Sequence, residues 1–208
     1  HCVTRRQRQM CIRDSRYPKA GEDNSKIDLY IVDTATNARK KIFLEDENPY
    51  YIPRIKFDGG QNSLIVQTLN RHQNHLKLLR WNTKNESTQL LLEEKDDTYI
   101  SIHDNLKFLN DNSFLWTSER DGFNHVYHYD QNGNLIQQIT KGDWEVTSLY
   151  SFNHKAKELY YQSVEGGSTE RFIYSIKLNG KGKRLIQGNK GTNGCLLYTS
   201  DAADELRS

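Results

Sequence analysis

Residues 113–140 read SFLWTSERDGFNHVYHYDQNGNLIQQIT, and this stretch predicts three short β-strands joined by two tight turns. Asp121-Gly122 and Asn132-Gly133 are turn signals, because Asp and Asn tolerate left-handed backbone and Gly adopts positive φ without strain. The first segment has an apolar and aromatic centre, and the second alternates between two faces. The third is shorter and more polar, as an outer edge strand would be. The stretch therefore predicts an antiparallel meander.

The same pattern recurs along the chain at a nearly constant spacing. The residues at which each third segment ends are Asp33, Asn82, Asp130 and Leu178, which are 49, 48 and 48 residues apart. The aromatic residues near the start of the first segments are Tyr51, Tyr99 and Trp144, which are 48 and 45 residues apart. A repeat of this length with four strands is typical of a β-propeller blade.

The repeat predicts an all-β fold, a fragment of a β-propeller with about three complete four-stranded blades and a leading hairpin. The expected strands of the hairpin cover residues 26–33 and 38–45, and the blades cover residues 50–94, 99–140 and 144–187. Propellers typically have about four to eight blades, so a chain of this size is expected to be part of a larger ring. A β-sandwich is the alternative, but it gives no reason for a fixed long period.

Composition narrows the class of protein. A hydrophobic content of 35% and a mean hydropathy of −0.87 are low for a globular chain and would suit disorder. The 11% aromatic content, the scarcity of proline and the strand-length apolar groups favour an ordered fold instead. A net charge of +2 gives no signal for a nucleic-acid partner. No apolar run is long enough for a membrane-spanning helix, and no signal peptide is visible.

The two ends differ from the middle of the chain. All three cysteines and the single methionine lie in residues 1–15 or 195–208. MCIRDS (10–15) and CLLYTSDAADE (195–205) resemble translated sequencing-adapter read-through, so both ends are interpreted as non-native and residues 16–194 as the partial propeller domain. The alternative is a poorly packed natural terminus. On this interpretation the cysteines form no disulfide or metal framework, and the N-terminal arginines form no nucleic-acid-binding arm.

Histidine pairs are the nearest approach to a metal motif in the sequence. His72 and His75 flank a predicted turn, and His125 and His128 share one predicted strand. Side chains three apart on a strand point to opposite faces, so a shared metal at His125 and His128 is disfavoured. The first pair lacks a third ligand. No metal site is therefore predicted.

Other polar and aromatic motifs have both structural and functional interpretations. No G-x-S-x-G nucleophile elbow, G-x-G-x-x-G sequence or P-loop is present. The charged run 118–121 (SERD) is interpreted as a hairpin turn in which Glu119 and Arg120 pair with neighbouring strands. Tyr99 and Trp144 would either line a central channel or fill the core between blades.

Five motifs in order resemble one known family. They are RYPKAGEDN (16–24), YIPRIKF (51–57), LNRHQN (69–74), SERDGFNHVYHYD (118–130) and ITKGDWEV (139–146). They resemble successive motifs in the propeller of the dipeptidyl peptidase IV family, bacterial type, within the prolyl oligopeptidase superfamily. The resemblance implies an eight-bladed propeller joined to a C-terminal α/β-hydrolase domain. It implies a serine exopeptidase that releases N-terminal X-Pro or X-Ala dipeptides with a Ser-Asp-His triad and no metal or organic cofactor.

The resemblance also sets expectations for sites and partners. The family's catalytic residues and paired glutamates are expected outside this chain, which would gate and seat peptide substrates for the hydrolase domain and be inactive alone. Residues 99–105 (YISIHDN) match a substrate-contacting stretch but lack its arginine, which leaves Tyr99 and His103 as candidate substrate-binding residues. A homodimer in the periplasm or at the cell surface is suggested by relatives alone. The alternative function is a non-enzymatic propeller that binds proteins.

Overall fold

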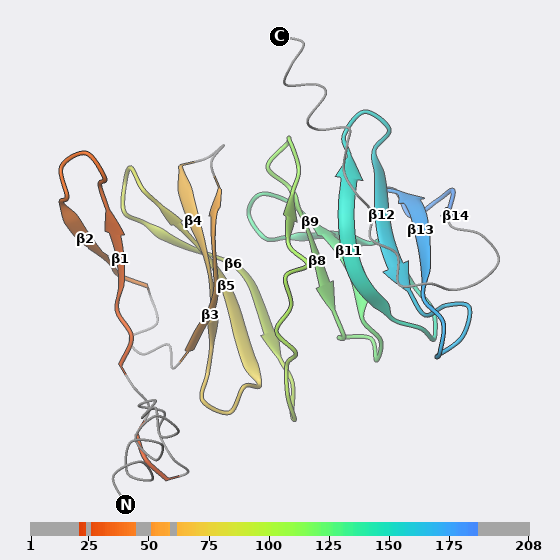
Figure 1. The fold of residues 1–208 in the computed structure, drawn as a ribbon, viewed down its shortest axis with the longest axis horizontal. Helices are drawn as coiled ribbons and strands as arrows, with labels where there is room; N and C mark the ends of the chain where they lie inside the picture. Colours follow the sequence, from red (N-terminus) through yellow and green to blue (C-terminus); the bar gives the residue numbers. More distant parts are fainter. Residues whose placement is uncertain (1–20, 24–25, 45–50, 59–61, 187–208) are drawn as a thin grey trace, which may run out of the picture. The chain divides into compact units, whose positions relative to one another are not determined.

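The structure is a computed structural model that describes residues 21–23, 26–44, 51–58 and 62–186. These residues form fourteen β-strands and no helix, which confirms the all-β prediction (Figure 1). The strands of the first half are β1 (Leu29–Val32), β2 (Arg39–Ile42), β3 (Tyr51–Asp58), β4 (Ser63–Leu69), β5 (His75–Asn82) and β6 (Thr88–Lys95). Those of the second half are β7 (Lys107–Phe108), β8 (Phe114–Ser118), β9 (His125–Tyr129), β10 (Leu135–Gln138), β11 (Val146–Asn153), β12 (Glu158–Ser163), β13 (Phe172–Lys177) and β14 (Arg184–Leu185).

Within each sheet, strands that follow one another in the sequence are paired. The sheets are the hairpin β1-β2 and three four-stranded sheets, β3-β4-β5-β6, β7-β8-β9-β10 and β11-β12-β13-β14. The pairings for which a register is defined are antiparallel throughout. The chain divides into two compact units between Ile100 and Ser101, except that Leu90–Leu92 of β6 group with the second unit. The expected hairpin and three four-stranded blades are thus confirmed.

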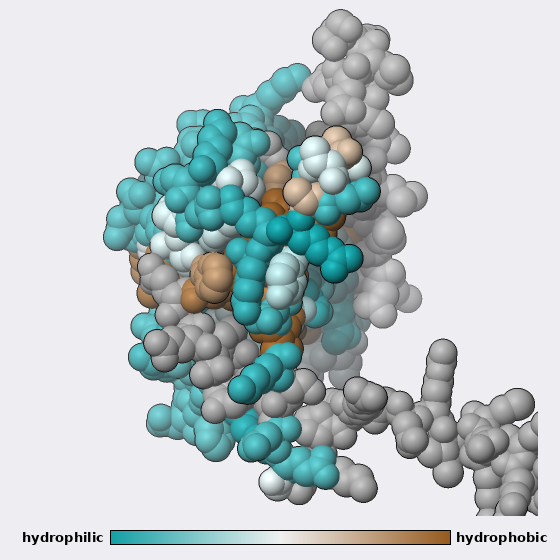
Figure 2. Space-filling model, turned by 90° about the vertical axis from the view of Figure 1, so that its left-hand side faces the viewer, coloured by the Kyte–Doolittle hydropathy of each residue, from teal (hydrophilic) through white to brown (hydrophobic). Residues whose placement is uncertain are grey.

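The two central strands of the four-stranded sheet in the first unit supply its buried apolar side chains. Ile65 and Val66 on β4 and Leu76, Leu78 and Trp81 on β5 are each at most 1% exposed. On the flanking strand β3, Ile55 and Phe57 are far more exposed, whereas Leu91 and Leu92 on β6 are buried. In Figure 2 hydrophilic residues dominate the face in view, with isolated hydrophobic patches between them.

In the second unit the two four-stranded sheets share one core. The buried side chains of this cluster come from both sheets and their connections; they are Leu109, Leu115, Val126, Ile139, Val146, Leu149, Leu159, Tyr161 and Ile176. Trp144 packs against the cluster, with its ring 6.3 Å from that of Tyr161 and 12° from parallel. Trp144 therefore fills the space between two blades, one of the two roles that the sequence left open.

The residues that recur about every 48 positions lie at the turns between the third and fourth strands of each blade. At each such turn an Asp or Asn Oδ1 accepts the backbone N–H two residues on, at 2.8 Å for Asp33, Asn82 and Asp130 and 3.0 Å for Asn179. These Asx turns satisfy backbone donors that have no ladder partner. In the last blade β13 ends at Lys177, one residue before the expected Leu178, and the turn residue is Asn179.

The innermost strand of the middle blade is much shorter than expected. The sequence predicted a strand over residues 99–109, but only Lys107–Phe108 pairs with β8. Residues 101–106 are not in a strand, because side chains of His103 and Asn105 form hydrogen bonds there that replace ladder bonds. The outermost strand β14 is also short, at two residues.

Both ends interpreted as non-native, residues 1–15 and 195–208, lie outside the described residues, as do the expected domain limits at 16 and 194. Across the described part of the chain, a search for long apolar helices that could cross a membrane finds none.

Candidate functional site

Tyr99 is the more accessible of the two candidate substrate-binding residues. Its side chain is 52% exposed, and it follows β6 in the first unit. The backbone N–H of Tyr99 donates to Oδ1 of Asp96 at 3.2 Å, and the same oxygen accepts the N–H and the hydroxyl of Thr98 at 2.7 and 2.6 Å. The hydroxyl of Thr98, followed by the backbone donors, lowers the pKa of Asp96. An ionised Asp96 thus holds the turn that exposes the Tyr99 ring.

His103 is held by bonds to its own unit. Its Nε2 lies 2.8 Å from the carbonyl oxygen of Thr117, which can only accept, so Nε2 carries the proton. Nδ1 then accepts the backbone N–H of Asn105 at 3.3 Å. The ring is half-buried, with its centroid 4.3 Å from that of Trp116. His103 is thereby fixed as a neutral ring that shapes the loop before β7.

Asn105 connects this loop to the neighbouring sheet. Its Oδ1 accepts the backbone N–H of Leu149 on β11 at 3.0 Å, and its Nδ2 donates to Oγ1 of Thr117 at 3.2 Å. Sequence reasoning missed this role. The available signal was a polar Asn in a segment interpreted as strand and a Thr within the apolar run of β8, whereas the partner Leu149 lies 44 residues away.

The SERD turn joins β8 to β9 and is held by side chains, as the structural interpretation predicted. Nε of Arg120 donates to Oγ of Ser118 at 3.1 Å, and the guanidinium lies 4.6 Å from the ring centroid of Tyr127. Asp121 accepts a hydrogen bond from the amide of Gln138. Burial, followed by the charge of Asp121, raises the pKa of Tyr127 above its usual range. This arrangement fixes the hairpin between β8 and β9.

The histidines of β9 bond to separate partners. His125 is fully buried, with Nε2 2.9 Å from the carbonyl oxygen of Gly142 and Nδ1 3.0 Å from Oγ1 of Thr140. His128 contacts Oγ of Ser113 at 2.9 Å. Burial lowers the pKa of His128, so the neutral ring is favoured. Each ring therefore forms hydrogen bonds with a different connecting segment, His125 with the one after β10 and His128 with the one before β8.

Of the other pair, His75 bonds to Glu93 on β6, with 2.6 Å between Nε2 and Oε1. A search of the described residues for groups of three or more metal-binding side chains finds none.

Comparison with known proteins places these features in a family context. The family described as the dipeptidyl peptidase IV (DPP IV) N-terminal region matches residues 3–205. Dipeptidyl peptidase 4 of Trichophyton equinum is 24% identical over 169 residues, which is 77% of this chain and 22% of that protein. Dipeptidyl peptidase 4 of Arthroderma otae is 25% identical over 176 residues, or 80% of this chain and 22% of that protein.

A solved structure is more similar than these fungal relatives. The crystal structure of Porphyromonas gingivalis dipeptidyl peptidase 4 superposes with a TM-score of 0.79 at 37% sequence identity, covering 86% of this chain and 26% of that one. The chain therefore spans about a quarter of the length of the proteins it resembles.

Proposed function

Because this chain belongs to the family of dipeptidyl peptidase IV N-terminal regions, we propose that it is the propeller part of a serine exopeptidase that releases N-terminal X-Pro or X-Ala dipeptides. The observation that carries the proposal is the family match over residues 3–205. The propeller would gate access to a C-terminal α/β-hydrolase domain and help to seat the peptide. Acyl transfer through a serine ester would take place in that domain.

The part of this chain proposed to meet substrate is the segment from Tyr99 to His103. Tyr99 supports this role by its exposed ring, which offers a flat apolar surface and a hydroxyl to a peptide. His103 supports it indirectly, since both ring nitrogens are already bonded within the protein. We assign contact to Tyr99 and positioning of the loop to His103.

The test begins with the full-length gene, recovered by amplification past both ends. The encoded protein should release the chromophore from a Gly-Pro anilide, and replacing the serine of a G-x-S-x-G elbow should abolish release. A gene that encodes no such elbow and no activity would overturn the proposal and favour a propeller that only binds proteins.

The role of Tyr99 has its own measurement. Tyr99→Ala in the full-length enzyme should raise KM several-fold with little change in kcat, because it removes binding that ground and transition states share. Tyr30→Ala is the matched control, since Tyr30 on β1 is 50% exposed. An unaltered KM in a Tyr99→Ala/His103→Ala double variant would remove both residues from the substrate site.

A further inference from the structure

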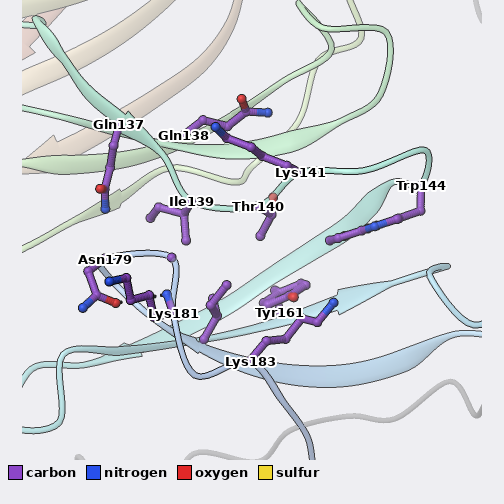
Figure 3. A pocket seen from close by; sticks show the side chains of 12 residues that line it. Gln137, Gln138, Ile139, Thr140, Lys141, Trp144, Tyr161, Asn179, Lys181 and Lys183 are labelled. Atoms are coloured by element: carbon purple, nitrogen blue, oxygen red, sulfur yellow. Dashed lines mark hydrogen bonds between the residues drawn. The ribbon is translucent and has the colours of Figure 1, made fainter.

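A pocket of about 650 Å³ lies between the two sheets of the second unit, at their outer strands (Figure 3). One wall is residues 137–141, the end of β10 and the loop after it, and the other is the turn 179–183 between β13 and β14. Trp144, Tyr161 and Ile176 complete the lining. Small-molecule sites commonly enclose roughly 300–1,000 Å³, so this volume suits a ligand of moderate size.

The lining carries positive charge without a carboxylate. Three of its residues are lysines, Lys141, Lys181 and Lys183, and none is Asp or Glu. Lys183 forms an ion pair with Glu165 outside the lining. Within the described residues, Lys141 and Lys181 form no ion pair. Like charges in one lining repel one another, so an anion bound between Lys141 and Lys181 would be stabilised by both ammonium groups.

The inner part of the pocket is apolar. Ile139 and Ile176 are each 4% exposed, and the Tyr161 side chain is fully buried. The half-buried Trp144 ring lies at the right in Figure 3, and the ammonium of Lys183 lies 5.6 Å from its centroid. A flat apolar group fits against such a surface while its charged end stays at the lysines.

The walls of the pocket are fixed by contacts that do not use the lysines. Gln137 donates from its amide to the carbonyl of Leu178, and Gln138 donates to Asp121. Gly180, at φ +74°, brings the turn so close that an added Cβ would lie 3.2 Å from the carbonyl oxygen of Ile139. The shape is therefore preorganised, which reduces the entropy cost of binding.

We propose that this pocket binds a small organic anion with an apolar, flat body, of the chemical class of an aromatic carboxylate. Lys141 and Lys181 hold the carboxylate, and Trp144 holds the ring. The proposal concerns a site separate from peptide hydrolysis and does not depend on the function proposed above.

The experiment titrates the 208-residue chain with 4-(trifluoromethyl)benzoate, followed by ¹⁹F NMR, and with the neutral 4-(trifluoromethyl)benzamide as matched probe. Saturable binding of the benzoate, about tenfold tighter than the amide, is expected from two charge-assisted contacts. Lys141→Gln/Lys181→Gln should weaken benzoate binding about two- to thirtyfold, since exposed ion pairs contribute about 0.2–1 kcal/mol each.

The control is Lys26→Gln/Lys84→Gln, which removes the same charge from two exposed lysines elsewhere and should leave benzoate binding unchanged. Circular dichroism checks that all variants keep their strand content. Equal affinity for the two probes, an equal loss in both double variants, or no saturation at millimolar benzoate would each overturn the proposal.

Discussion

The Oδ1 oxygen of Asn105 accepts the backbone N–H of Leu149 at 3.0 Å, so one side chain joins the inner loop of one blade to the first strand of the next. Replacing Asn105 with alanine leaves that half-buried N–H without its partner. The free energy of unfolding should fall by about 1–3 kcal/mol, the usual cost of an unsatisfied buried group. Urea unfolding followed by circular dichroism measures it. The exposed Asn132→Ala is the control, and equal losses in both variants would contradict the prediction.

Protonation of His128 should weaken the fold at acid pH. Burial lowers its pKa below the ordinary 6.5, whereas the charge of Asp111 acts in the opposite direction. The unfolded chain therefore binds the proton first, so the contribution of His128 to stability is constant above about pH 6.5 and decreases as the pH falls below it. Unfolding midpoints at pH 7.5 and 5.0 should differ less in His128→Gln than in the parent chain. The same difference in both would show that His128 does not titrate in this range.

The Asx turns predict that Asp and Asn are interchangeable at Asn82. Asn82→Ala removes the acceptor for the N–H groups of Lys84 and Asn85 and should lower the free energy of unfolding by about 0.5–1.5 kcal/mol. Asn82→Asp should preserve the turn, because Asp33 and Asp130 occupy the equivalent position in their own turns. Thermal unfolding of the two variants provides the comparison. An aspartate as harmful as alanine would argue against the shared mechanism.

Alanine substitutions at Gly180 and Gly122 distinguish the energetic cost of backbone strain from the cost of close packing. Both have positive φ, +74° and +99°, but a Cβ at Gly180 would lie 3.2 Å from the carbonyl oxygen of Ile139, whereas one at Gly122 would meet no atom within 4 Å. Alanine at either site should cost about 1–2 kcal/mol for the left-handed backbone. Gly180→Ala should lower the free energy of unfolding more than Gly122→Ala does, because its Cβ also meets the carbonyl oxygen of Ile139. Chemical denaturation of the pair tests this, and equal losses would mean that the turn moves aside freely.

Strands were predictable where alternation and turn residues agree. The bounds of His75–Asn82 and His125–Tyr129 match the expectation at both ends, because apolar residues there face a core and an Asp or Asn turn follows. Residues 99–106 were misinterpreted as strand, because the bonds made by His103 and Asn105 involve residues 12 to 44 positions away. Sequence alone does not reveal such partners.

The same reasoning explains what was missed at the candidate sites. Exposure of Tyr99 follows from local bonds to Asp96, which a short motif can encode. The pocket lined by Lys141, Lys181 and Lys183 joins residues 137–144 to residues 176–183, which only the stacking of two sheets brings together. Lys141, Lys181 and Lys183 carry no signal in the sequence, because isolated lysines are ordinary surface residues.

The turn at the outer edge of every blade is closed by hydrogen bonds that span only a few residues. A blade-length segment of the gene therefore carries its own turn with it when it is duplicated or lost. Selection would then have to adjust only the faces where neighbouring blades pack. The number of blades in a propeller can thus change by whole repeats during evolution, because either Asp or Asn closes the turn that each repeat carries.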